Sequence, residues 1–154
     1  MFKLSAPKGK GGEIQRMVFE QIQVGDRASF SKTVTESDIT LFAGITGDLN
    51  PLHVDAEFAR QTVFGGRIAH GMLTGGLISA VLGTRLPGPG TIYLSQSLQF
   101  LRPVYPGDTI TAEVEVIEKV PRKNRLRLRT TCHNQKGEQV LDGEAVVMLK
   151  EEVD

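Results

Sequence analysis

Apolar residues in the first half of the chain recur at intervals of three and four, which is the spacing of amphipathic helices. Thr35 is followed three residues later by an acid and then by a periodic apolar run, the sequence of a capping box. This pattern predicts a helix over residues 35–47, which cannot continue past Pro51 because proline lacks the backbone donor. Residues 55–60 have the pattern of one or two helical turns. Residues 71–86 are apolar on most sides and predict a second, buried helix.

The second half of the chain shows the two-residue alternation of β-strands. Turn-forming residues separate the expected strands, which cover 91–104, 109–120, 124–134 and 139–149, with a weaker strand at 27–34. The two middle strands are expected to pair with charges on one face and apolar side chains on the other. The expected pairs are Glu113–Arg129, Glu115–Arg127, Val114–Leu128 and Val116–Leu126. The predicted architecture is α+β, with a curved antiparallel sheet packed against the buried helix.

Composition and charge narrow the class of protein. A chain of 154 residues fits one domain, and we expect a flexible tail at residues 1–17 followed by a single domain at 18–154. The 18 basic and 18 acidic residues cancel, which argues against a general attraction to nucleic acid or acidic membranes. Cys132 is the single cysteine, so an intrachain disulfide and a cysteine-rich zinc site are excluded. Since no apolar run has the length of a membrane span or the form of a secretory signal, we expect a cytoplasmic protein.

Candidate chemistry is concentrated in residues 42–53. Asp48 and His53 stand on either side of a proline bend, where a carboxylate and an imidazole can hold and polarise one water. Asn50 can hydrogen-bond its own loop and stiffen it. The spacing also allows a structural interpretation, in which Asp48 belongs to the turn after a helix and His53 is a satisfied, partly buried histidine. A metal is not expected, because no third ligand follows His53 and Asp55 at a suitable spacing.

This segment resembles the hydratase-2 motif of the MaoC-like, (R)-specific enoyl-CoA hydratases. The matching positions are Phe42, the run Thr46-Gly47-Asp48-Leu49-Asn50-Pro51-Leu52-His53, and Ala59. Residues 68–73 resemble the His-Gly-Met segment of the family, and the similarity covers residues 24–149. The resemblance implies a hot-dog fold, which is a curved antiparallel sheet wrapped around a central helix. It also implies a homodimer with active sites at the subunit interface, and it is nearest to the short single-domain hydratases that feed polyhydroxyalkanoate synthesis.

The resemblance implies hydration of a trans-2-enoyl-CoA to an (R)-3-hydroxyacyl-CoA. Asp48 and His53 would activate one water and deliver the α proton, and which of them is base and which is acid stays open. The backbone N–H of Gly71, at the start of the buried helix, is expected to stabilise charge on the thioester oxygen. The expected substrate-binding residues are Gly71, Asn50, His70 and Ser79, with loop fixing as the alternative for His70 and packing for Ser79. No cofactor is expected, since coenzyme A is part of the substrate.

Other functions are compatible with the same fold. One is a 3-hydroxyacyl-[acyl-carrier-protein] dehydratase, although those enzymes typically pair His with Glu on separate segments. A second is a non-catalytic acyl-CoA-binding subunit, which would be free to lose Asp48 or His53. A thioesterase would release free coenzyme A. The basic run 119–129 could bind coenzyme A phosphates, a carrier protein or RNA. The expected hairpin neutralises two of its arginines, so no nucleic-acid partner is predicted.

Overall fold

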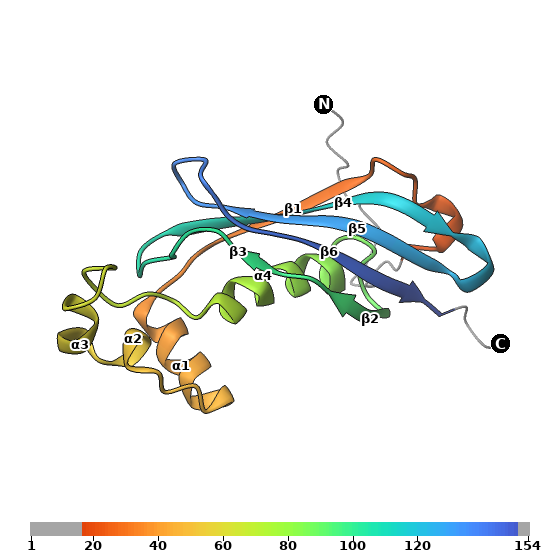
Figure 1. Cartoon of the computed structure of the whole chain (residues 1–154). Coiled ribbons are helices and arrows are strands. Elements are labelled where there is room, and N and C mark those ends of the chain that lie inside the picture. Colours follow the sequence, from red (N-terminus) through yellow and green to blue (C-terminus); the bar gives the residue numbers. More distant parts are fainter. Residues whose placement is uncertain (1–16, 151–154) are drawn as a thin grey trace, which may run out of the picture.

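The computed structural model of the protein describes residues 17–150. A curved six-stranded sheet extends over α4 (Gly71–Thr84), and the short helices gather beneath one end of the sheet (Figure 1). This is the α+β arrangement predicted from the sequence, with an antiparallel sheet curled around a central helix. The expected tail falls outside the described residues except for Met17, which packs against the hydrophobic core and therefore belongs to the domain.

The sheet is antiparallel throughout its described part, in the order β1-β4-β5-β6-β2, with β3 also paired to β6. Its strands are β1 (Arg27–Thr33), β2 (Thr91–Gln96), β3 (Gln99–Phe100), β4 (Thr109–Val120), β5 (Arg125–His133) and β6 (Gln139–Leu149). In β4, alternate side chains from Ile110 to Val116 are buried. The two-residue alternation of the sequence therefore reflects one face on the core and one face toward solvent.

One predicted strand is interrupted. The sequence predicts a strand over 91–104, but β2 ends at Gln96 and β3 spans two residues. The chain passes very close to β6 at this break, since a Cβ on Gly143 would overlap the carbonyl oxygen of Ser97. Residues 101–104 then leave the sheet and line the cavity described below.

The β4–β5 hairpin forms with a register two residues away from the predicted one. The observed pairs are Glu113–Thr131, Val114–Thr130, Glu115–Arg129 and Val116–Leu128. A bulge follows Val116, and the connection occupies a 3-10 turn at Pro121–Lys123 together with Asn124, whose φ is 47°. A shift by two residues keeps every side chain on its face. The charged and apolar faces are therefore as predicted, while the individual pairs were wrong.

The first helix follows the predicted capping box closely. α1 (Glu36–Thr46) begins after Thr35, whose hydroxyl accepts from the Asp38 N–H while the Asp38 carboxylate accepts from the Thr35 N–H. These two bonds satisfy backbone donors that a helix N-terminus otherwise leaves unpaired. α1 ends at Gly47, which takes a left-handed φ of 77° and turns the chain toward the candidate loop.

Two further short helices complete this part of the chain. α3 (Ala56–Arg60) corresponds to the predicted helical turns, and Asp55 caps it by accepting from two backbone N–H groups. α2 (Pro51–Val54) is a helix that the sequence analysis missed. Its signals were present, since Asn50 accepts from the Leu52 N–H as N-cap and proline occupies the first helical position.

The central helix α4 packs one side against the sheet. Its buried residues are Leu73, Thr74, Leu77, Ile78, Val81 and Leu82. The expectation of burial on most sides was wrong for this chain, because Met72, Gly76, Ser79 and Gly83 are exposed. Cys132 of β5 lies in the core opposite α4, where burial raises the pKa of its thiol to about 12. Among residues 17–150, no helix is both long enough and apolar enough to cross a membrane.

Candidate active site

Asp48 sits on the loop that leaves α1, and local hydrogen bonds hold this loop. The Asp48 N–H donates to the Thr46 hydroxyl at 3.2 Å, and the Asp48 carboxylate accepts from the Asn50 N–H at 3.2 Å. The residue is exposed, so its carboxylate remains available to a bound molecule. Asn50 directs its own oxygen to the Leu52 N–H. The loop-stiffening role expected of Asn50 therefore has a direct structural basis.

His53 projects from α2 and is nearly buried, with 8% of its surface exposed. Its Nδ1 lies 2.7 Å from the carbonyl oxygen of Ile68. A carbonyl oxygen can only accept, so Nδ1 carries the proton in this contact and the neutral ring presents a lone pair at Nε2. Nε2 is therefore the ring nitrogen of His53 that remains available to a bound molecule.

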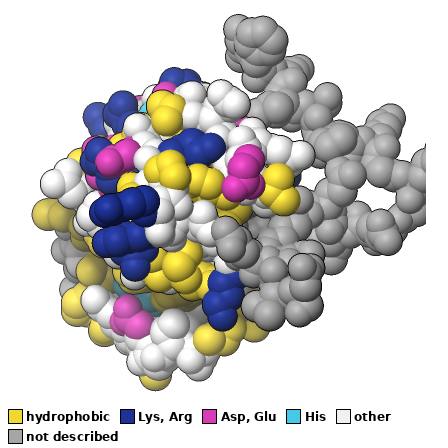
Figure 2. Space-filling view, turned by 90° about the vertical axis from the view of Figure 1, so that its right-hand side faces the viewer, with side chains coloured by type: hydrophobic (Ala, Val, Ile, Leu, Met, Phe, Trp, Pro, Cys, Tyr) yellow, Lys and Arg dark blue, Asp and Glu magenta, His cyan; other side chains and the backbone are white. Residues whose placement is uncertain are grey.

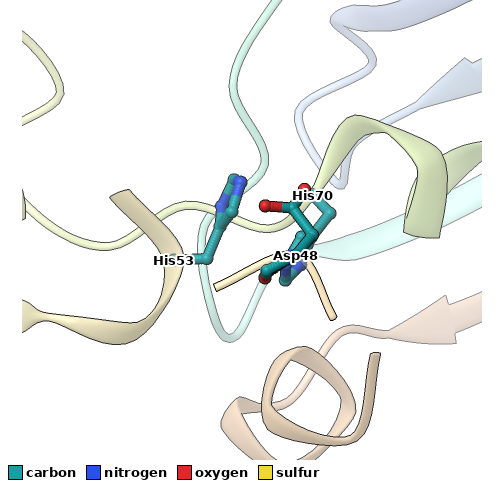
Figure 3. Close-up of side chains that lie close together, drawn as sticks. All are labelled: Asp48, His53 and His70. Atoms are coloured by element: carbon teal, nitrogen blue, oxygen red, sulfur yellow. Dashed lines mark hydrogen bonds between the residues drawn. The ribbon is translucent and has the colours of Figure 1, made fainter. Parts of the chain in front are cut away.

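His70 completes a three-residue group with Asp48 and His53. The side chains come from the loop after α1, from α2, and from the residue before α4 (Figure 3). One nitrogen of each histidine and one carboxylate oxygen of Asp48 all lie within 4.8 Å of one another. His70 is 2% exposed, its Nε2 donates to the Asp48 carbonyl oxygen at 3.0 Å, and its ring stacks on His53 at 3.8 Å. The fold thus unites positions that are separated by up to 22 residues in the sequence.

This group raises the question of a metal ion, because His70 supplies the third side chain that the spacing analysis did not find. Ring lone pairs lie in the ring plane, and the planes of His53 and His70 are stacked and inclined by 30°. A zinc ion needs its nitrogen ligands to converge at about 2.0–2.1 Å, which stacked rings do not do. The residues therefore do not fit a metal centre in this arrangement.

A cavity of about 430 Å³ lies beside the Asp48–His53 pair. Its other walls are mainly apolar and come from the start of α4 and from residues 100–104. Figure 2 shows hydrophobic side chains around a hollow in which a histidine is visible, with basic side chains above it. Several lining residues were not singled out from the sequence, namely Phe64, Phe100, Leu101 and Arg102. Phe64 lies in a loop and the other three in a strand-like pattern, neither of which signals a cavity, and only the tertiary fold brings them there.

The predicted substrate-binding residues divide into two sets. Gly71 and His70 line the cavity, whereas Asn50 and Ser79 do not. Ser79 lies on the exposed side of α4. Its expected place in the acyl pocket is therefore not formed within this chain.

α4 begins at Gly71, and the first backbone N–H groups of this helix are unpaired in the described part of the chain. The N-cap residue His70 makes no side-chain cap, and among the described residues the N–H groups of Gly71 and Met72 have no hydrogen-bond acceptor. A Cβ on Gly71 would lie 2.7 Å from the Phe100 ring, so glycine is required for the ring to approach. Free N–H groups at a helix N-terminus favour an acceptor with negative charge. Gly71 and Met72 both line the cavity, as do Asp48 and His53.

The fold and this site define a known class of protein. A family model described as "MaoC like domain" matches residues 19–138, and the chain belongs to this family. The family resemblance seen in residues 42–59 and the hot-dog fold that it implied are both confirmed.

Individual relatives are similar over nearly the whole chain. The "(R)-specific enoyl-CoA hydratase" of Rhodospirillum rubrum is 57% identical over 131 residues, covering 85% of this chain and 90% of that protein. The "3-hydroxybutyryl-CoA dehydratase" of Methylorubrum extorquens is 51% identical over 144 residues, covering 92% and 91%. Among solved structures, the unliganded R-hydratase PhaJ1 from Pseudomonas aeruginosa superposes with a TM-score of 0.85 at 52% identity, covering 90% of this chain and 89% of that one.

Proposed function

We propose that the protein catalyses the reversible, (R)-specific hydration of trans-2-enoyl-CoA to (R)-3-hydroxyacyl-CoA. The observation that carries the proposal is the placement of Asp48 and His53 on one wall of the cavity, beside the unpaired N–H groups at the start of α4. An enoyl thioester requires these two features together. Water must be deprotonated as it attacks the β carbon, and charge must be stabilised on the thioester oxygen.

One water can be held between the two side chains. An ionised Asp48 accepts hydrogen bonds, and Nε2 of a neutral His53 also accepts. A water that donates one hydrogen to each directs its lone pairs toward the substrate. As its oxygen bonds to the β carbon, one proton passes to the pair. A proton of the same pair is delivered to the α carbon. The two groups act as a coupled unit, so the separate roles of base and acid are shared between them.

The thioester oxygen is placed at the N-terminus of α4. The Gly71 N–H donates to this oxygen as charge builds during attack, and the partial positive charge of the helix end adds to the stabilisation. Because Asp48 and His53 lie on the same wall, the hydroxyl and the proton add to the same face of the double bond. This geometry gives a single enantiomer of the product.

We also propose that the protein works as a homodimer in the cytoplasm. β2 is an edge strand, and an unpaired edge with apolar side chains needs cover. Tyr93 and Leu94 of β2 are 37% and 41% exposed. Met72 and Phe100 at the cavity are 59% and 53% exposed. A second subunit would cover this surface and close the cavity. Light scattering after gel filtration should give twice the chain mass, and a monomer that is fully active would contradict the proposal.

The reaction is tested by following the absorbance of the enoyl thioester when purified protein meets crotonyl-CoA. Loss of absorbance should occur without release of free coenzyme A, and an (R)-specific dehydrogenase should oxidise the product. Release of free coenzyme A would identify a thioesterase instead. Activity on carrier-protein thioesters but not on coenzyme A thioesters would favour the dehydratase. A lack of both hydration and thioester hydrolysis with either kind of thioester would favour a binding subunit.

A further inference from the structure

His70 lies at the centre of the site, yet the reaction proposed above gives it no proton to move. Its ring stacks on the His53 ring with centroids 3.8 Å apart, and the tilted ring of Phe42 lies 4.7 Å from it. Its side chain is nearly inaccessible, with 2% of the residue surface exposed. His70 lines the cavity, but a bound thioester has little access to its ring.

The hydrogen bonding of His70 fixes its proton. Nε2 lies 3.0 Å from the Asp48 carbonyl oxygen, which can only accept, so Nε2 carries the hydrogen. Nδ1 is buried and has no hydrogen-bond partner among the described residues. A second proton placed at Nδ1 would find no acceptor there. The ring is therefore suited to act as a neutral donor that keeps one proton on one atom.

From this arrangement we propose that His70 is a positioning residue that aligns both members of the catalytic pair. It holds the Asp48 backbone through the Nε2–H bond, and it supports the face of the His53 ring through the stack. His53 is fixed independently at its edge by the Ile68 carbonyl oxygen. The edge contact and the stack together hold the His53 ring in place, and both His53 and Asp48 line the cavity.

The position of His70 in the chain also serves this role. As the N-cap of α4 it could cap the helix with a side-chain acceptor, but its side chain turns back to the Asp48 loop instead. Serine, threonine, asparagine or aspartate at an N-cap bonds to the first-turn N–H groups. Such a residue would compete for donors at the helix end and would release the Asp48 loop. Histidine at position 70 avoids both effects.

Two substitutions separate the contacts of His70. His70→Phe keeps a ring against His53 and removes the donor to Asp48, while His70→Gln keeps an N–H near the position of Nε2. With crotonyl-CoA, we expect His70→Phe to lower kcat roughly 10- to 100-fold with KM changed by less than about threefold, since small misplacements of reacting groups have effects of this size. His70→Gln should recover a substantial part of the loss. The matched control His133→Phe, on β5 away from the cavity, should leave kcat unchanged.

The double variant with Asp48→Asn shows whether His70 acts through Asp48. In that background, His70→Phe should change kcat by less than about threefold, because a group that acts through another loses its effect when that group is inactive. An equal loss in both backgrounds, or a wild-type kcat for His70→Phe, would overturn the proposal.

A second measurement needs neither substrate nor variants, and it stays decisive if His70→Phe does not fold. The chain has three histidines, so ¹⁵N NMR of the imidazoles can resolve them. We expect the proton on Nε2 of His70 and on Nδ1 of His53. A proton on Nδ1 of His70 would overturn the positioning role. This inference rests on the proposed function, but wild-type protein without hydratase activity would refute only that function, since the NMR result reports on the geometry itself.

Discussion

The β4–β5 hairpin and the segment from Gly47 to Gly71 hold their side chains in different ways. The hairpin repeats one contact pattern, in which alternate residues are buried and polar side chains pair across neighbouring strands. The segment instead depends on a few specific polar contacts, such as those of His53 and His70 with distant carbonyl oxygens. The hairpin stabilises the fold through the apolar surface that it buries. The segment instead holds a few polar side chains in a defined arrangement.

Substitutions in the proposed catalytic pair should show the largest loss of activity. Asp48→Asn and His53→Ala should each lower turnover at least ~100-fold, because acid–base groups contribute on that scale. Asp48 is exposed and His53 is at the cavity wall, so the fold should persist. Steady-state kinetics with crotonyl-CoA, together with circular dichroism of each variant, checks both parts. Near-normal turnover in either variant would remove the proposed pair.

In the hairpin, a substitution is expected to lower stability and to leave kcat nearly unchanged. Leu128 is fully buried between the sheet and α4, and Leu128→Ala should cost about 2–5 kcal/mol of unfolding free energy through lost contacts and a cavity. Urea unfolding measures the cost. The kcat per folded molecule should stay within about twofold of wild type. A large loss of kcat in protein that is fully folded would show that the two regions are coupled.

A smaller loss of stability is expected where β6 packs closely against the backbone at Ser97. A Cβ on Gly143 would overlap the backbone oxygen of Ser97, so Gly143→Ala should cost about 1–3 kcal/mol, as overpacking does. Gly44→Ala is the matched control, because its Cβ would meet nothing within 4 Å on α1. That change should be neutral or stabilising by up to about 1 kcal/mol. Equal unfolding midpoints for the two variants would contradict this account of the break after β2.

The smallest effect concerns the cap of α1. Thr35→Ala should lower the free energy of unfolding by about 0.5–2 kcal/mol.

The same cap makes stability depend on pH. The hydrogen bond from the Thr35 backbone lowers the pKa of the Asp38 carboxyl, and Lys32 adds to the shift. Because the folded pKa is below the unfolded value, this stabilisation is present above about pH 4 and is lost as pH falls through the folded pKa. The stability deficit of Asp38→Asn, measured by urea unfolding, should therefore be larger at pH 7 than at pH 3. An equal loss of stability at pH 7 and at pH 3 would contradict this dependence on the Asp38 pKa.

The sequence predicted most of the architecture, because each strand and helix repeats a pattern that its own residues define. α1 and β4 match their predicted positions closely, since a capping box and a strict alternation are local signals. The hairpin register was wrong by two residues because a bulge and a longer connection change pairing without changing faces. The interruption of the strand at Ser97 could not be predicted from the sequence either, because it depends on Gly143 of β6.

The candidate site was predictable only in part. Asp48 and His53 stand in one short motif, so their proximity follows from the sequence. The tautomer of His53 depends on the Ile68 carbonyl, and the placement of His70 depends on the Asp48 carbonyl. Backbone carbonyls are present at every residue and carry no sequence signal. The exposed position of Ser79 likewise follows from which side of α4 faces the sheet.

The central claim is that Asp48 and His53 act on one water from one wall of the cavity. The most direct test is hydration of crotonyl-CoA in D₂O, with the relative configuration of the product read by NMR coupling constants. The account predicts one deuterium on the α carbon and a single diastereomer, formed by addition of hydroxyl and deuterium to the same face. Addition to opposite faces, or a mixture of diastereomers, would contradict a single pair acting from one side.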